Sequence, residues 1–102
     1  MVKVELSNKG FVIYGHAEYD KLGYDIVCSA ISALAQTIFL SMRESCNVIN
    51  ASKTRGFMYV EVDESDYSNL LLRTLYLGVR EVEKTYPSYV RINKVDEVVY
   101  NE

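Results

Sequence analysis

The chain has 102 residues, with 49% hydrophobic and 25% charged side chains and a formal net charge of −3. This length predicts a single domain over residues 1–102 that can bury a core without disulfides or metal ions. A slightly acidic chain does not offer the basic face that phosphate backbones require, so direct nucleic-acid binding is not expected.

The start of the chain, Met1–Leu6, alternates apolar and polar residues, unlike the apolar core of a secretory signal. No uninterrupted apolar run approaches the roughly 18 residues of a membrane span. We therefore expect a cytoplasmic protein without membrane association, in which Cys28 and Cys46 are free thiols.

Hydrophobic periodicity predicts the order strand, strand, helix, strand, strand, helix, strand. Strands are expected at 2–7 and 11–16, followed by a polar loop at 17–24. A long apolar helix is expected from about Asp25, as its N-cap, to about Ser45, and to be buried on most sides.

The second half of the chain again predicts a hairpin and then a helix. Asp63 or Ser65 can cap this helix. The expected positions are strands at 48–52, 57–63 and 89–95, and a helix to about Thr85 that Pro87 ends. The predicted class is α+β, with a mainly antiparallel or mixed sheet packed with two long helices.

The only histidine, His16, ends the second predicted strand, and Cys28 lies in or just before the first turn of the first predicted helix. Unpaired backbone N–H groups at a helix start stabilise an anion, as a neighbouring imidazolium does. The two residues are therefore candidates for a base and a nucleophile, and the helix start is a candidate oxyanion site. The competing interpretation is a buried structural cysteine and a structural histidine.

Other residues near this pair are candidates for supporting roles. Gly15 removes side-chain bulk beside His16, which allows the close approach of another group to the backbone. Ser32 lies four residues after Cys28 on the same helical face, and is either a hydroxyl near the thiol or a polar spacer bonded to a helix carbonyl. One histidine and two distant cysteines predict no metal site, and without a Gly-rich phosphate loop we expect no cofactor.

The segment Gly15-His16-Ala17, followed by Gly23-x-Asp25-Ile26-Val27-Cys28-Ser29-Ala30-Ile31-Ser32, resembles the ribosomal-processing cysteine protease Prp family. The resemblance implies a cytoplasmic cysteine endopeptidase, generally a homodimer. Its substrate would be the precursor of a large-subunit ribosomal protein (number twenty-seven), which loses an N-terminal extension during ribosome assembly. The resemblance also implies that Cys28 is the nucleophile, His16 the base, Asp25 and Ser32 supporting residues, and residues 17–24 a mobile cover over the bound peptide.

The alternative function is a non-catalytic ribosome-assembly or protein-interaction module, in which Cys28 is a packed core residue. Thiol reactivity separates the two, because an activated Cys28 should be alkylated faster than Cys46 at mildly acidic pH. The apolar first helix and nine tyrosines favour a dimer interface, whose position the sequence does not predict.

Overall fold

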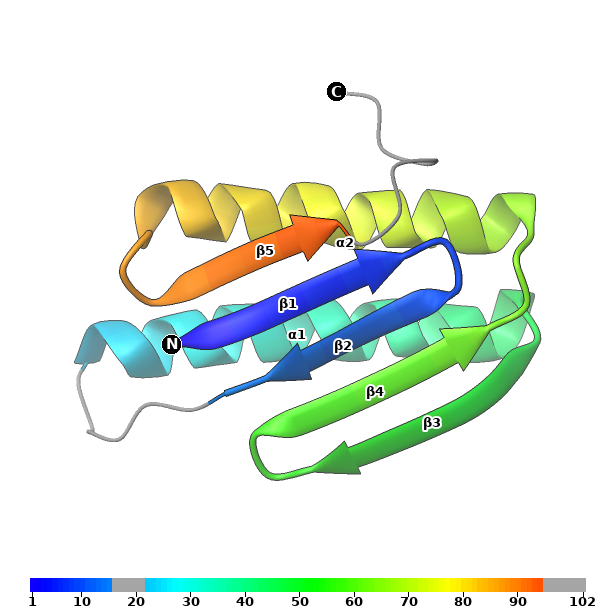
Figure 1. The fold of residues 1–102 in the computed structure, drawn as a ribbon, viewed down its shortest axis with the longest axis horizontal. Helices are drawn as coiled ribbons and strands as arrows, with labels where there is room; N and C mark the ends of the chain where they lie inside the picture. The colour runs from blue at the N-terminus through cyan, green and yellow to red at the C-terminus, as the bar shows by residue number, and fades with distance from the viewer. Residues whose placement is uncertain (16–21, 95–102) are drawn as a thin grey trace.

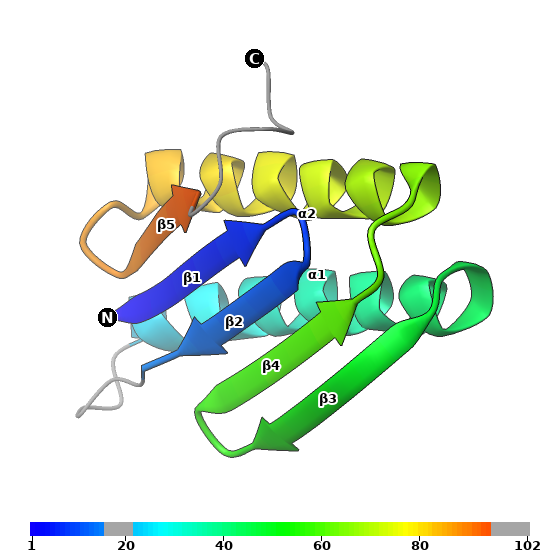
Figure 2. The ribbon, with the colours of Figure 1, turned by 45° about the vertical axis from the view of Figure 1, so that its right-hand side comes forward.

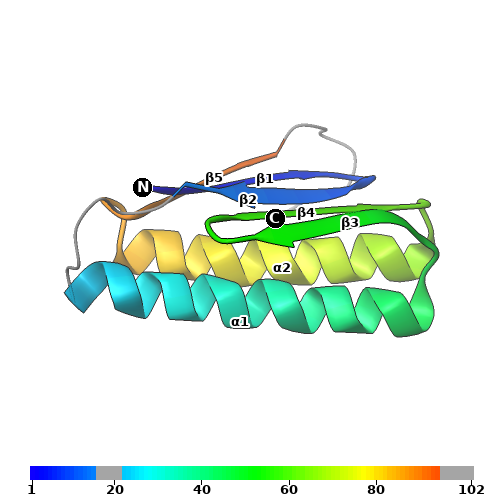
Figure 3. The same ribbon diagram turned by 90° about the horizontal axis from the view of Figure 1, so that it is seen from below.

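The computed structural model describes residues 1–15 and 22–94, and its elements follow the predicted order. The elements are β1 (Val2–Ser7), β2 (Gly10–Tyr14), α1 (Leu22–Ser45), β3 (Val48–Thr54), β4 (Phe57–Val62), α2 (Asp66–Thr85) and β5 (Val90–Lys94). Figure 1 shows the five described strands side by side, and Figure 3 shows both helices on one face of that sheet. The predicted α+β fold, a mixed sheet packed with two long helices, is therefore confirmed.

The sheet has the strand order β3-β4-β2-β1-β5 (Figure 2). The β1–β2 and β3–β4 hairpins are antiparallel, and β2 joins them by pairing antiparallel with β4. The β5 strand instead pairs parallel with β1, with Val2 opposite Val90. This parallel pair makes the sheet mixed, because α2 carries the chain across the sheet before β5 begins.

The core lies between the sheet and the two helices. Along β1 the buried side chains alternate with more exposed ones, so Val4 and Leu6 face the helices and Glu5 faces the open side. Register continues this buried layer across the sheet, because Leu6 pairs with Phe11 and Phe11 pairs with Val60. Helix α1 contributes Val27, Ile31, Ala35, Ile38 and Met42, and α2 contributes Leu72, Leu75, Tyr76 and Val79.

Helix α1 is less enclosed than the sequence suggested. Ile26 is 47% exposed and Leu40 is 54% exposed, so the prediction that α1 is buried on most sides is wrong. The sheet and α2 cover only part of its circumference, and no third layer of the described chain lies over its outer face (Figure 3).

The stretch Ile26–Ser45 of α1 has a mean hydropathy of 1.5 and is long and apolar enough, by length and composition, to cross a membrane. A count of uninterrupted apolar residues did not reveal this, because small polar residues interrupt the stretch. Val27, Ile31 and Met42 nevertheless pack their side chains into the core, as expected for a core helix on a sheet.

Helix α2 begins at one of its two predicted caps. Ser65 Oγ accepts a 3.0 Å hydrogen bond from the backbone N–H of Ser68, and Ser68 Oγ accepts a 2.8 Å bond from the N–H of Ser65. This reciprocal capping box satisfies two backbone donors at the helix start. The buried Ser68 side chain is therefore bonded rather than orphaned.

Candidate active site

A hollow of about 180 Å³ lies between the first half of α1 and the tip of the β3–β4 hairpin. Cys28 and Ser32 line it from α1, and Ile13 and Gly15 line it from β2 and the residue after it. Phe57, 40% exposed, lines it from the hairpin. The mouth of the hollow is open to solvent, and most of its wall is formed by apolar side chains. Such a wall suits the binding of a polypeptide segment whose apolar side chains displace water from the hollow.

Cys28 is a half-buried free thiol between this hollow and the core. Its neighbour Val27 is fully buried, and Ile31 is almost so, which holds this part of α1 against the sheet. Cys28 therefore packs partly against the core, as the alternative prediction of a buried structural cysteine expects. It also lines a hollow that a ligand can enter. Ser32, one turn further on, is exposed and lines the same hollow, in agreement with their predicted shared face.

The backbone conformation at position 15 requires a glycine. Its φ of +103° is one that side-chain-bearing residues rarely adopt, and a β-carbon there would lie 2.3 Å from the carbonyl oxygen of Met1. The predicted close approach to this glycine is therefore made by the N-terminal residue of the chain itself. Gly15 also lines the hollow that contains Cys28.

The start of α1 differs from the prediction. The helix begins at Leu22, so Asp25 is its fourth residue, and the prediction that Asp25 is the N-cap is wrong. The predicted loop at 17–24 extends too far for the same reason, because Leu22, Gly23 and Tyr24 are helical.

This earlier start also moves Cys28 away from the free N–H groups. Cys28 is the seventh residue of α1, roughly 9 Å along the axis from Leu22 at about 1.5 Å per residue. Only the first four N–H groups of a helix lack an intrahelical partner. The prediction that Cys28 lies in the first turn, beside helix-start oxyanion donors, is therefore wrong.

His16 and residues 17–21 lie outside the described residues, so the predicted imidazole and the body of the predicted cover are not placed. The residue bonded to His16 on its N-terminal side is Gly15, at the rim of the Cys28 hollow. Strand β2 ends at Tyr14, and the described Gly15 lies after it.

The β3–β4 hairpin adds residues that sequence reasoning missed. Lys53, Thr54 and Gly56 line the hollow together with Phe57. Strand β3 continues to Thr54, two residues beyond its predicted end, and this extension carries the hairpin tip over α1. The available signal was Phe57, an aromatic residue directly after a turn, which the sequence interpretation assigned only to a strand.

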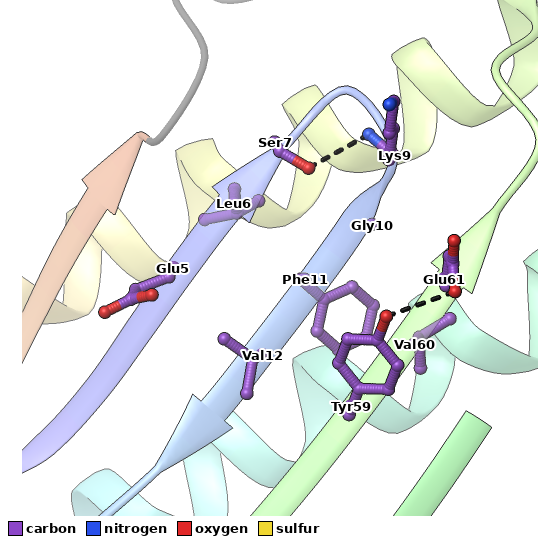
Figure 4. A pocket seen from close by; sticks show the side chains of 10 residues that line it. All are labelled: Glu5, Leu6, Ser7, Lys9, Gly10, Phe11, Val12, Tyr59, Val60 and Glu61. Carbon is purple, nitrogen blue, oxygen red and sulfur yellow. Dashed lines mark hydrogen bonds between the residues drawn. The ribbon is translucent and has the colours of Figure 1, made fainter. Parts of the chain in front are cut away.

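A larger hollow, of about 270 Å³, involves β1, β2 and β4 on the opposite side of the sheet from α1 (Figure 4). It forms where Gly10, which has no side chain, pairs with Ser7 on one side and Glu61 on the other. Tyr59 donates a 3.2 Å hydrogen bond to Glu61 at its edge. None of its lining residues is a cysteine, so the candidate thiol chemistry belongs to the smaller hollow at Cys28.

Comparison with known proteins gives consistent matches. The model of the family described as cysteine protease Prp matches residues 1–91. The ribosomal processing cysteine proteases Prp of two Staphylococcus aureus strains are each 26% identical over 87 residues, covering 80% of this chain and 82% of theirs. The crystal structure of the S. aureus ribosomal processing protease Prp with a covalently linked product peptide has a TM-score of 0.79 at 21% identity, covering 92% of this chain and 99% of that chain. A Streptococcus mutans crystal structure has a TM-score of 0.77 at 21% identity, covering 95% of this chain and 96% of that chain.

Proposed function

Because this chain belongs to the cysteine protease Prp family, we propose that it hydrolyses a peptide bond with Cys28 as nucleophile and His16 as general base. The observation that carries the assignment is that Cys28 and Gly15 line one hollow. Gly15 belongs to the G-H-A segment and is covalently bonded to His16, and Cys28 belongs to the D-I-V-C segment. The two segments are separate in sequence, and a residue from each lines this hollow. Cys28 is also accessible there while its neighbours anchor the helix.

The proposed reaction follows from these two side chains. The His16 imidazole takes the thiol proton, and Sγ of Cys28 attacks the scissile carbonyl carbon. The C–N bond then breaks, and the imidazolium gives its proton to the leaving amine, which leaves a thioester on Cys28. His16 then takes a proton from water, whose oxygen attacks the thioester carbonyl carbon. The C–S bond breaks, the carboxylic acid product is released, and the imidazolium returns the proton to Sγ of Cys28.

We propose the precursor of large-subunit ribosomal protein twenty-seven as the substrate, cleaved at its N-terminal extension in the cytoplasm. The S. aureus relatives are named ribosomal processing proteases, and the sequence motifs resemble that family at His16 and Cys28. A peptide segment in extended form can enter an open hollow such as this one.

The test is to incubate the purified protein with the extended ribosomal protein and to follow the products by mass spectrometry. Cys28→Ala and His16→Ala should each abolish cleavage. Cys46→Ala is the matched control, because Cys46 is also a half-buried free thiol and lines neither the Cys28 hollow nor the larger one. Cleavage that survives in Cys28→Ala would refute the mechanism.

Alkylation separates the protease from a non-catalytic binding module. Cys28 and Cys46 are both partly buried free thiols. A difference in their labelling rates that depends on His16 reports thiolate character rather than access. Faster labelling of Cys28 at mildly acidic pH, lost in His16→Ala, supports the protease. Equal and slow labelling of both thiols supports the module.

We also propose that the protein is a homodimer. The family resemblance supports this, as do Leu40 on α1 and Leu70 on α2, which are 54% and 60% exposed. Sedimentation equilibrium at micromolar concentration should give twice the chain mass of 11.7 kDa. A single species of monomer mass at that concentration contradicts the proposal.

A further inference from the structure

The Cys28 hollow continues along α1. A neighbouring hollow of about 160 Å³ shares three lining residues with it, namely Gln36, Lys53 and Met58. Its far end reaches Phe39. The two hollows together form one groove between α1 and the β3–β4 hairpin, which we call the α1–β3 groove.

Side-chain alternation explains why this groove is open. Lys53 pairs with Met58 and Ala51 pairs with Val60, and both partners are buried on the helix side of the sheet. Lys53 and Ala51 therefore lie on that same side, yet both are exposed. A methyl group at 51 and a charged side chain at 53 do not fill the space above α1, so the core stops short of β3.

The β3 strand also offers backbone hydrogen-bonding groups. It is the end strand of the described sheet and pairs only with β4. Residues 49–54 are all exposed. An edge strand presents a row of N–H and C=O groups to which an extended peptide can add as a further strand.

The length of the groove limits the number of peptide residues that it can hold. Cys28 and Phe39 are eleven helical residues apart, which corresponds to roughly 16 Å at about 1.5 Å per residue. An extended chain covers about 3.3 Å per residue, so roughly five residues fit along this length. The groove therefore matches a short peptide segment better than a single side chain.

We propose that the α1–β3 groove holds the substrate on one side of its scissile bond, as an extended strand of about five residues beside β3. This inference rests on the proposed function, because continuity with the Cys28 hollow is what makes an extended polypeptide the occupant. The bond to be cleaved lies at the Cys28 end, and the chain runs towards Phe39 past Ala51.

The test fills the far hollow of the groove, which Ala51 lines and Cys28 does not, so the thiol is not touched. Ala51→Trp places an indole in the groove. Asn50→Trp is the matched control. Asn50 directly precedes Ala51, is exposed, lines neither hollow and pairs with Glu61, so its side chain lies on the side of the sheet away from α1. The substitution changes this side chain only and keeps the backbone N–H and C=O groups of β3. Circular dichroism and alkylation of Cys28 by a small reagent should be the same for both variants and the unmodified protein.

Cleavage is measured on three peptides. The long peptide has at least six residues on each side of the scissile bond. Each of the two shortened peptides has only two residues on one side and the full length on the other, and the two differ in which side is shortened. We expect Ala51→Trp to lower kcat/KM at least tenfold on the long peptide and on the form whose groove-bound side is intact. On the other shortened form it should match the unmodified protein. Asn50→Trp should leave all three values unchanged.

The outcomes separate the two hypotheses. If the unmodified protein cleaves the long peptide and Ala51→Trp does so equally well, the groove inference is overturned and the proposed function stands. An equal loss on all three peptides also overturns it, because the effect is then independent of the groove-bound residues. If the unmodified protein cleaves none of the peptides, both the proposed function and this inference are overturned.

Discussion

A β-carbon on Gly78 of α2 would lie 3.0 Å from Cδ2 and 3.1 Å from Cδ1 of Leu34 in α1. The two helices therefore meet with bare backbone on one side and the branched end of a leucine on the other. This contact sets how closely α2 lies beside the helix that carries Cys28.

Gly78→Leu should destabilise the protein by about 1–3 kcal/mol, because added side-chain atoms at a filled contact force neighbours off their preferred positions. The free energy of unfolding from urea titration measures the loss. In a Leu34→Ala background the same change should cost less, since the removed isopropyl group leaves room for the new side chain. An identical cost in both backgrounds would show that the two residues do not compete for this space.

Gly15→Ala should both destabilise the fold and lower peptide cleavage. The φ of +103° and the Met1 carbonyl oxygen, 2.3 Å from the position of the new β-carbon, together require the backbone beside His16 to shift. A cost of roughly 1–3 kcal/mol is expected for this strain. Gly78→Ala is the control, because Gly78 is helical and its new methyl would meet only the flexible end of Leu34. Thermal unfolding and cleavage assays on both variants test the difference, and equal behaviour of the two would contradict it.

Ser65→Ala should lower stability by about 1 kcal/mol, because the N–H of Ser68 loses its acceptor at the start of α2. Ser65→Asp should retain most of the stability, since a carboxylate also caps and is favoured by the helix dipole. Chemical denaturation of the three proteins gives the comparison. A loss as large in Ser65→Asp as in Ser65→Ala would argue against the capping role.

The open face of the sheet predicts a pH effect. Tyr14 donates a 2.6 Å hydrogen bond to Glu5, and this bond, with reduced contact with water and the nearby negative charge, raises the pKa of Tyr14 above its usual 10.0. Glu5→Gln should lower the pKa of Tyr14 towards the ordinary value. Tyr59, whose pKa is raised by reduced contact with water and by Glu61, should not change. Ring-resonance NMR titration distinguishes the two, and an unchanged pKa for Tyr14 would contradict the prediction.

The sign of the effect on stability follows from the direction of that shift. The folded protein holds the phenol of Tyr14 neutral more strongly than the unfolded chain does. Its contribution is therefore complete below pH 10 and is lost as the pH rises through the raised pKa of Tyr14. Glu5→Gln should make unfolding less sensitive to pH in this alkaline range.

Periodicity predicted the elements well where one face of an element is buried. Alternation in β1 and the Ser65 cap of α2 are local signals, and both lead to observed structure. The spacing of Tyr67, Leu71, Leu75 and Val79 predicts one apolar stripe along α2, but Tyr67 is 65% exposed. The buried stripe of α2 instead begins at Ser68 and continues through Leu72, Leu75 and Val79. Because the capping box makes the small polar Ser68 compatible with burial, apolar periodicity alone places this stripe one residue too early at the helix start.

The sequence predicts only those residues of the candidate site that belong to its motif, and it does not predict the residues that the β3–β4 hairpin adds. Cys28 and Ser32 share a hollow because they are four residues apart on one helix. Lys53 reaches the same hollow only because β3 continues beyond its predicted end and pairs with β4. Such a contact depends on the register of residues far apart in the chain, which composition and local spacing do not encode.

The parallel pairing of β1 with β5 has a consequence for how the protein comes to be folded. Val2 and Val90 are neighbours in the sheet although nearly the whole described chain separates them. A contact of such large sequence separation raises the contact order and slows folding, because a long loop must close before the pairing contributes any stability. During synthesis, β1 has no strand on its second side until β5 has left the ribosome. We therefore expect a nascent chain that ends before Val90 to keep an unpaired edge along β1, and a complete sheet to form only after translation has reached the last strand.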